Sequence, residues 1–178
     1  MIGDEDILEA KQHSNDKKFF LNILKENPKL LEWASDELKN DKEVVMKALE
    51  ADGGMLEFAS DDLKNDKEVV IKSVSKVGWT CCFASENLKD DKDVLIAGTK
   101  VDGQVLYYAS KRLRDDREVV LSAIENKPTI LKYVSFRLRD DEEIARYAIE
   151  HASDKTKKEV YSYLSERLQN NEEIKNLL

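Results

Sequence analysis

A unit of 25 residues recurs in tandem along the sequence, and this recurrence constrains the fold more than any other feature. The string NDKEVV occupies residues 40–45 and again residues 65–70, and the related strings DDKDVL and DDREVV begin at Asp90 and Asp115. A segment this short cannot bury a hydrophobic core by itself, so neighbouring copies must pack against one another. The sequence therefore predicts an array of stacked repeats.

The repeat register assigns almost all of the 178 residues to equivalent segments. Residues 1–15 are predicted to form an N-terminal cap, and residues 171–178 a partial repeat or C-terminal cap, unless the chain is cut from a longer protein. Between these ends we place six repeats, at residues 16–40, 41–65, 66–90, 91–115, 116–140 and 141–170. The sixth repeat is lengthened by five residues around the string HASDKTK.

The first half of each repeat has the pattern of a helix with one apolar face. Counting Asp41 as position one, positions four, five, eight and nine are mostly apolar and share one side of a helix. The residue before each repeat is Asn or Asp, and an acidic residue follows three positions later, which predicts a capping box. Pro or Gly at position thirteen predicts that the helix ends after about eleven residues. The predicted N-caps are Asn40, Asn65, Asp90, Asp115 and Asp140.

The second half of each repeat predicts another amphipathic helix of about the same length. Positions fifteen, sixteen, eighteen, nineteen and twenty-three are mostly apolar, and position eighteen is aromatic in every repeat. Helices this short are marginal alone, so we expect an all-α fold, an α-solenoid of about six two-helix repeats with terminal capping helices. The aromatic residues should form one continuous buried seam: Trp33, Phe58, Phe83, Tyr108, Tyr133 and Tyr163.

Composition excludes several classes of protein. No stretch approaches 18 consecutive apolar residues, and the N-terminus lacks the pattern of a signal peptide, so we expect no membrane partner and a cytoplasmic location. The chain has only two histidines and two cysteines, which predicts no metal site and no cofactor. Its net charge of −8 makes nucleic acid an unfavoured partner, although a local basic patch would be compatible with it.

Residues that recur in every repeat are predicted to serve the fold. Six copies of a serine at position twenty, with no histidine base nearby, indicate capping of a short final turn or a bond to a helix carbonyl. The recurrent acidic residues indicate helix capping, because no calcium-loop spacing is present. Cys81 lies in an apolar position and Cys82 in a surface position, and a reactive role for Cys82 stays an alternative. No catalytic residue is therefore predicted, and we expect no enzymatic activity.

The DKEVV string, the aromatic residue followed by Ala-Ser, and the Leu three residues after that serine resemble a known repeat family. This is the domain of unknown function 4116, a short helical repeat that recurs in tandem in bacterial and protist proteins, including large proteins of intracellular bacteria. The resemblance covers roughly Asp16 to Leu178 and departs from the pattern in the sixth repeat, at Ala145 and Arg146. It implies the helical fold and, by analogy only, a non-enzymatic role.

Positions that should face solvent but differ between repeats are the candidate binding site. Along the second helices, positions seventeen, twenty-one and twenty-two change from acidic in the early repeats to basic or aromatic in the later ones. Positions seventeen and twenty-one are four apart on a helix, so we expect one cluster from two adjacent repeats. Its residues are Tyr107, Lys111, Lys132 and Phe136, flanked by Arg112 and Arg137, with Trp79 as a separate candidate. The alternative is that these aromatic residues pack only on neighbouring side chains.

These features predict a non-enzymatic protein-interaction scaffold whose partner is a protein of unknown identity. One alternative is a helical repeat that binds single-stranded nucleic acid, but the relevant positions are basic in only about half of the repeats. Another alternative is a structural segment of a larger multidomain protein, including an effector delivered into a host cell. The oligomeric state does not follow from the sequence.

Overall fold

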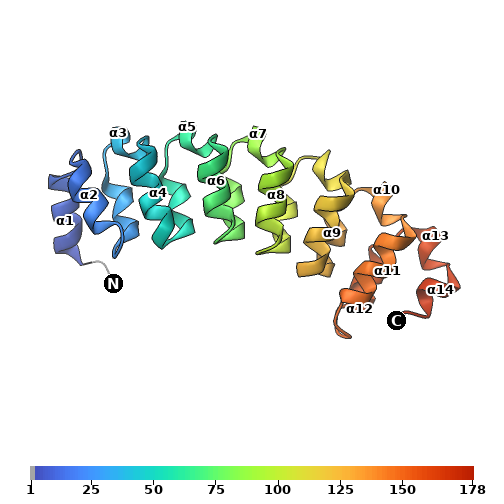
Figure 1. Cartoon of the computed structure of the whole chain (residues 1–178). Helices are drawn as coiled ribbons and strands as arrows, with labels where there is room; N and C mark the ends of the chain where they lie inside the picture. Colours follow the sequence, from blue (N-terminus) through green and yellow to red (C-terminus); the bar gives the residue numbers. More distant parts are fainter. Residues whose placement is uncertain (1–2) are drawn as a thin grey trace. The chain divides into compact units, whose positions relative to one another are not determined.

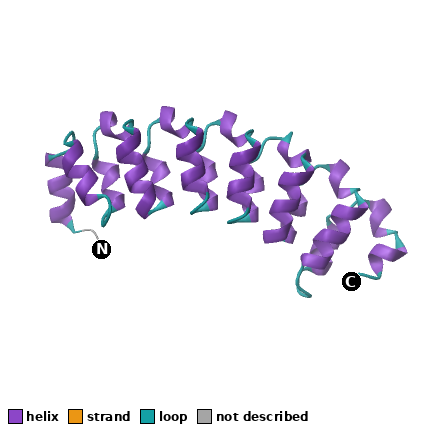
Figure 2. Cartoon of the chain, in the orientation of Figure 1, coloured by secondary structure: helices purple, strands orange, loops and turns teal. Residues whose placement is uncertain are grey.

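The computed structural model describes residues 3–178, and every regular element within that range is helical (Figures 1 and 2). The all-α class and the tandem helical repeats predicted from the sequence are confirmed. The chain divides into two compact units, one ending at Leu88 and the other beginning at Lys89. No helix in the described part of the chain has the length and apolar composition that a membrane span requires.

In the N-terminal unit, α-helices alternate with 3₁₀ helices, which are labelled η. The elements are α1 (Asp4–Gln12), α2 (Lys17–Ile23), η1 (Pro28–Trp33), α3 (Asp36–Lys39), α4 (Lys42–Ala51), η2 (Gly53–Phe58), α5 (Asp61–Lys64), α6 (Lys67–Val74), η3 (Gly78–Phe83) and α7 (Glu86–Lys89). The longer helices α4 and α6 come from successive repeats and lie side by side (Figure 1).

The C-terminal unit repeats the same order of elements. They are α8 (Lys92–Thr99), η4 (Gly103–Tyr108), η5 (Leu113–Asp115), α9 (Arg117–Asn126), η6 (Pro128–Tyr133), α10 (Phe136–Arg139), α11 (Glu142–His151), α12 (Lys157–Ser162), α13 (Glu166–Gln169) and α14 (Glu172–Lys175). In the lengthened sixth repeat, the α-helix α12 stands where the other repeats have a 3₁₀ helix.

The first helix of each repeat begins one residue later than the sequence analysis predicted. In α4 the N-cap is Asp41, whose carboxylate accepts hydrogen bonds from the backbone N–H groups of Glu43 and Val44 at 3.0 and 3.3 Å. The preceding Asn40 instead ends the short helix α3, so the predicted capping box at Asn40 is wrong. The same correction applies at the N-caps Asp66, Asp91, Asp116 and Asp141.

The predicted second helix is not continuous, which is the main difference from the sequence analysis. In the second repeat it consists of the 3₁₀ helix η2, an extended pair formed by Ala59 and Ser60, and the short helix α5. Ser60 Oγ accepts a hydrogen bond from the Leu63 N–H at 3.2 Å and caps α5. The backbone breaks at this serine because its hydroxyl replaces the bond that a continuous helix would supply. The prediction that the serine caps a short final turn is confirmed.

A backbone hydrogen bond joins each of these extended pairs to the preceding repeat. In the N-terminal unit the N–H of Ser60 donates to the carbonyl of Lys39 at 3.0 Å. In the C-terminal unit the N–H of Ser135 donates to the carbonyl of Arg114, also at 3.0 Å. Because these bonds use only main-chain atoms, they hold successive repeats in register whatever the outward side chains are.

The core lies between the two halves of each repeat, where the predicted apolar positions are buried. Positions five and sixteen of the first five repeats are fully buried, as at Val45 and Leu56. The aromatic position eighteen is only half-buried, so the predicted interior seam is wrong. Phe58, for example, is the last residue of η2, is half-buried, and lines a hollow at the surface.

Candidate functional site: the outward face of the repeats

A ladder of ion pairs connects the first helices of successive repeats within each unit. Lys42, at position two of one repeat, places its Nζ 2.8 Å from Asp66 Oδ2 and 2.7 Å from Glu68 Oε2 of the next. Burial tends to raise the pKa of the Asp66 carboxyl, but the hydrogen bonds from Lys42 and from the Val69 N–H outweigh it and hold that pKa below its ordinary value. Lys17 with Asp41, Lys92 with Asp116 and Arg117 with Asp141 repeat the arrangement.

A second network connects the short helices and explains part of the charge change along the chain. The serine hydroxyl at position twenty donates to the Asn or Asp that ends the preceding repeat. In the N-terminal unit Ser85 Oγ donates to Asn65 Oδ1 at 2.6 Å. In the C-terminal unit Ser110 donates to Asp90, and Arg112 also binds that carboxylate, with its Nε 3.1 Å from Oδ1 and its Nη2 2.6 Å from the Asp90 carbonyl.

Positions twenty-five and twenty-two therefore change together between neighbouring repeats. Where a repeat ends in Asn, position twenty-two of the next repeat is acidic or Asn, and where it ends in Asp, that position is Arg. The pairs are Asn15 with Glu37, Asn40 with Asp62, Asn65 with Asn87, Asp90 with Arg112, Asp115 with Arg137, and Asp140 with Arg167. The arginine guanidinium neutralises the carboxylate of the Asp, which is absent from the repeats that end in Asn.

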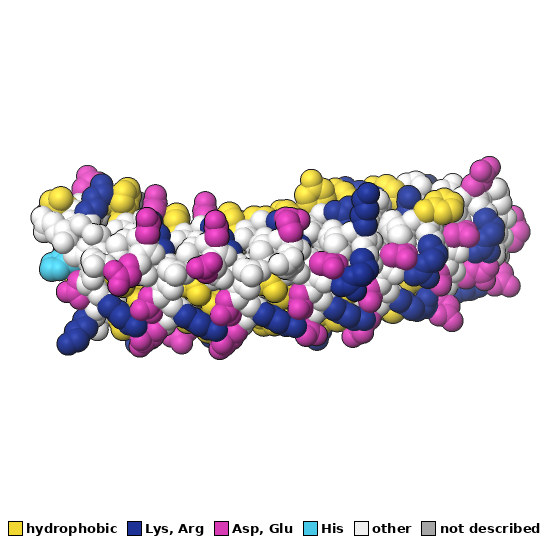
Figure 3. Space-filling view, turned by 90° about the horizontal axis from the view of Figure 1, so that it is seen from above, with side chains coloured by type: hydrophobic (Ala, Val, Ile, Leu, Met, Phe, Trp, Pro, Cys, Tyr) yellow, Lys and Arg dark blue, Asp and Glu magenta, His cyan; other side chains and the backbone are white. Residues whose placement is uncertain are grey.

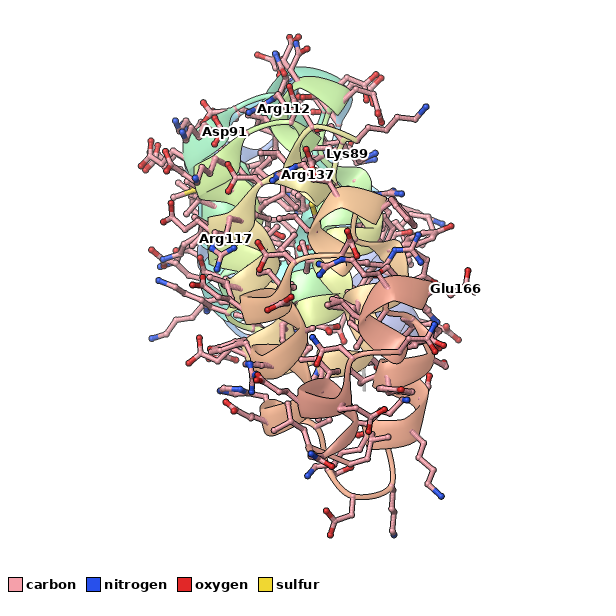
Figure 4. The ribbon with its side chains drawn as sticks, turned by 90° about the vertical axis from the view of Figure 1, so that its right-hand side faces the viewer. Lys89, Asp91, Arg112, Arg117, Arg137 and Glu166 are labelled. Atoms are coloured by element: carbon pink, nitrogen blue, oxygen red, sulfur yellow. The ribbon has the colours of Figure 1, made fainter. Side chains whose placement is uncertain are left out.

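We call the serine and the arginine that bind one carboxylate of the preceding repeat, together with that carboxylate, a clamp. Arg112 and Arg137, predicted to flank a binding site, each belong to such a clamp. Both side chains stay exposed on the same edge of the C-terminal unit, one repeat apart (Figure 4). The hydrogen bonds from Ser135 and Arg137 lower the pKa of the Asp115 carboxyl. The two arginines therefore have a structural partner that the sequence analysis did not foresee.

Tyr107 and Lys132 meet through an aromatic ring of the later repeat. The Tyr107 ring centroid lies 5.1 Å from that of Tyr133 and 5.3 Å from that of Tyr108, edge to face in both cases. The Lys132 Nζ lies 4.9 Å from the centroid of the Tyr133 ring. Tyr107 packs on its neighbours, as the alternative expected, yet it keeps 52% of its surface exposed.

Phe136 and Lys111 occupy equivalent positions at the start of the short elements in successive repeats. Phe136 is the first residue of α10, is 67% exposed, and has the Arg139 guanidinium 6.0 Å from its ring centroid. Lys111 lies in the turn before η5, after the break at Ser110. The prediction that positions seventeen and twenty-one share one helical stripe is therefore wrong, because this break separates them. We call the four exposed residues Tyr107, Lys111, Lys132 and Phe136 the aromatic-basic face.

The equivalent positions of the N-terminal unit form an acidic face. It consists of the exposed residues Glu32, Asp36, Glu57 and Asp61. Acidic side chains predominate over the N-terminal unit in the view of Figure 3, whereas Lys and Arg are prominent over the C-terminal unit. A shallow hollow of about 290 Å³ opens on the acidic face, and it is lined by Asp36, Lys39, Phe58, Ala59, Ser60 and Asp61.

The remaining candidates lie outside both faces. Trp79 is in the N-terminal unit, 48% exposed, with its ring centroid 5.6 Å from that of Phe83. Cys81 is buried and Cys82 is half-buried. Among residues 3–178, no group of three or more His, Cys, Asp or Glu side chains is arranged to hold a metal ion.

The clamp and the ion-pair ladder are the features that sequence reasoning missed. A signal for the clamp was present, because Asn or Asp at one position predicts the charge at another position 22 residues later, as at Asp90 and Arg112. That pattern appears only when the last residue of one repeat is compared with position twenty-two of the next repeat. It does not appear when each repeat position is compared by itself across the repeats.

Comparison with known proteins agrees with the repeat architecture. The family model Domain of unknown function (DUF4116) matches residues 16–64, 41–85, 66–114 and 116–157. No curated protein matches the chain significantly, and neither does any solved structure. The overlapping matches extend over most of the chain in steps that follow the 25-residue unit. The chain belongs to the family Domain of unknown function (DUF4116).

Proposed function

We propose that this chain is a non-enzymatic protein-interaction scaffold that binds a protein partner through its aromatic-basic face. The observation that carries the proposal is the exposure of Tyr107 and Phe136 on two adjacent repeats that also expose Lys111 and Lys132 and whose buried positions are like those of the other repeats. Neither Lys111 nor Lys132 forms an ion pair with the residues that the structure describes. Exposed aromatic residues next to cations are typical of the centres of protein interfaces.

The repeat positions that maintain the fold differ from those that face outward, and this supports the role of an interaction scaffold. Buried positions, ion-pair ladder and backbone bonds hold each repeat in place, so outward side chains can change without loss of the fold. Arg112 and Arg137 add positive charge at the border of the face, but their bonds to Asp90 and Asp115 limit how far they can turn toward a partner. We therefore assign the main recognition role to the two aromatic residues and the two lysines.

The test is a comparative capture experiment with the purified chain from cells that express it. The double variant Tyr107→Ser with Phe136→Ser should lose at least one protein that wild type retains at moderate salt. The matched control is Val101→Ser, which removes an exposed apolar residue of the same unit, 41% exposed, outside the face. An identical set of captured proteins for wild type and both variants would overturn the proposal.

A further inference from the structure

The two units carry very different charges. Residues 1–88 contain 12 Lys and Arg against 19 Asp and Glu, whereas residues 89–178 contain 17 against 18. The contrast is sharpest at equivalent outward positions, where Glu57 and Asp61 of the acidic face correspond to Lys132 and Phe136 of the aromatic-basic face. One chain thus displays two faces of opposite character.

We propose that the aromatic-basic face of one copy docks on the acidic face of a second copy of this chain. The inference rests on the proposed function, because it uses the same binding face and names the partner. Its first support is charge complementarity. Lys111 and Lys132 on one face, and Asp36 and Asp61 on the other, form no ion pairs within residues 3–178. Bringing the two faces together supplies both lysines with counter-charges.

The shapes of the two faces are also complementary. Phe136 projects from the aromatic-basic face with two thirds of its surface in water. The lining of the hollow on the acidic face includes the apolar side chains of Phe58 and Ala59 together with the carboxylates of Asp36 and Asp61. A phenyl ring in this hollow would bury its apolar surface, and its electropositive edge would face the carboxylates. Lys39 also lines the hollow, and the lining therefore has a net negative charge of one.

The contact joins two different surfaces, so it is heterologous. A pair of docked copies leaves one acidic face and one aromatic-basic face unoccupied. A head-to-tail contact of this kind continues beyond a dimer unless the rotation between copies closes a ring. The association should therefore depend on concentration and should weaken as added salt screens the charges.

The first experiment measures the mass of the full chain in solution. Analytical ultracentrifugation at low salt should show a weight-average mass that rises above 20.5 kDa as the concentration increases into the millimolar range. About 0.5 M sodium chloride should shift the mass back toward the monomer. A mass that stays at that of the monomer across the whole concentration range at low salt would overturn the inference.

Two charge-reversal variants make the assignment specific. Lys111→Glu with Lys132→Glu reverses the charge of the aromatic-basic face, and Asp36→Lys with Asp61→Lys cancels the net charge of the acidic face, because Glu32 and Glu57 remain. Each variant alone should lose self-association by about tenfold or more in Kd, because the first variant has two acidic faces and the second has no face with a net negative charge. An equimolar mixture should associate again, since the first variant keeps an intact acidic face and the second an intact aromatic-basic face. Unchanged association of either variant alone, or no association in the mixture, would overturn the inference.

A third variant separates the shape argument from charge alone. Phe136→Ser keeps every charge and removes the projecting ring, and it should weaken self-association by about tenfold as well. The control Val101→Ser should leave it unchanged. Equal self-association of Phe136→Ser and wild type would exclude docking through the hollow. A chain that stays monomeric yet loses a captured protein in the Tyr107 and Phe136 double variant would refute the second-copy partner and leave the proposed function standing.

Discussion

At the scale of single residues, the charge of one side chain is set by its partner in the next repeat. Asp115 accepts hydrogen bonds from Ser135 and Arg137, whereas Asn40 accepts one from Ser60 and has no guanidinium to neutralise. An amide and a carboxylate are therefore not interchangeable at this position. Each requires a different residue 22 positions later.

Exchanging the members of this clamp should show their coupling. Asp115→Asn alone leaves Arg137 without its counter-charge, and Arg137→Glu alone places a carboxylate beside Asp115. The double variant recreates the combination found in the early repeats, so we expect it to be more stable than the sum of the single changes predicts. Because the pair is exposed, the coupling should be about 0.2–1 kcal/mol. Urea unfolding of all four proteins measures it, and strictly additive effects would contradict it.

Gly53 is required by the close approach of the next repeat. A Cβ at this position would lie 2.8 Å from the carbonyl oxygen of Ser73, whose hydroxyl in turn donates to the Gly53 carbonyl. Gly53→Ala should destabilise the chain by about 1–3 kcal/mol, measured by thermal unfolding. Gly54→Ala is the control, because the atoms nearest to its Cβ would belong to the Asp52 side chain and not to the backbone of the next repeat. Equal effects of the two changes would show that the close approach is not the cause.

At the scale of elements, each of the first five repeats is a long helix followed by a 3₁₀ helix and a short capped element. The sequence predicts the long helix well, because its apolar positions fall on one face and its cap is misplaced by a single residue, from Asp41 to Asn40. It predicts the second element poorly. Five apolar positions at helical spacing also fit a 3₁₀ helix followed by a break, and only the hydrogen bonds of Ser60 distinguish the two.

The serine cap should be the weak point of the short element. Ser60→Ala removes the acceptor of the Leu63 N–H and the donor to Asn40, and it should cost about 1 kcal/mol of stability. Ser60→Thr keeps both functions and should behave nearly as wild type does. Hydrogen exchange of the Leu63 amide reports the cap directly. Unchanged protection of that amide in Ser60→Ala would contradict the assignment.

At the scale of the whole molecule, the ion-pair ladder makes stability depend on pH. The pKa values of Asp41, Asp66 and Asp116 lie below their ordinary value in the folded chain, because lysine and backbone hydrogen bonds outweigh the effect of burial. Carboxyl groups of this kind stabilise the folded state above the unfolded pKa near 3.8, and the contribution is lost as the pH falls through the lower folded pKa.

Acid should therefore lower the free energy of unfolding. The urea midpoint should be constant between about pH 5 and 8 and should fall from about pH 4 downward, as the carboxylates take up protons. Lys42→Gln with Lys92→Gln removes two of the ammonium donors. The double variant should be less stable at neutral pH and should lose less stability on acidification than wild type does. An equal loss in both proteins would show that the ladder is not responsible.

For the candidate site, the sequence predicts which residues are exposed but not which residues they contact. The exposure of Tyr107 and Phe136 was predictable, because both interrupt positions that are polar in the early repeats. Their surroundings were not. Tyr107 meets Tyr133 where the 3₁₀ helices η4 and η6 pack together, and Arg137 binds the same Asp115 carboxylate that accepts the Ser135 hydrogen bond.

The main-chain bond between successive repeats has a consequence for how such chains grow and diversify. In the sixth repeat the N–H of Ser165 still donates to the carbonyl of Arg139, at 3.2 Å, although five extra residues lie between them. A backbone hydrogen bond between successive repeats can therefore form with loops of different lengths between its donor and its acceptor. Duplication or loss of one 25-residue module in frame should then yield a folded chain, and genes for such proteins can change length without first inventing a new junction.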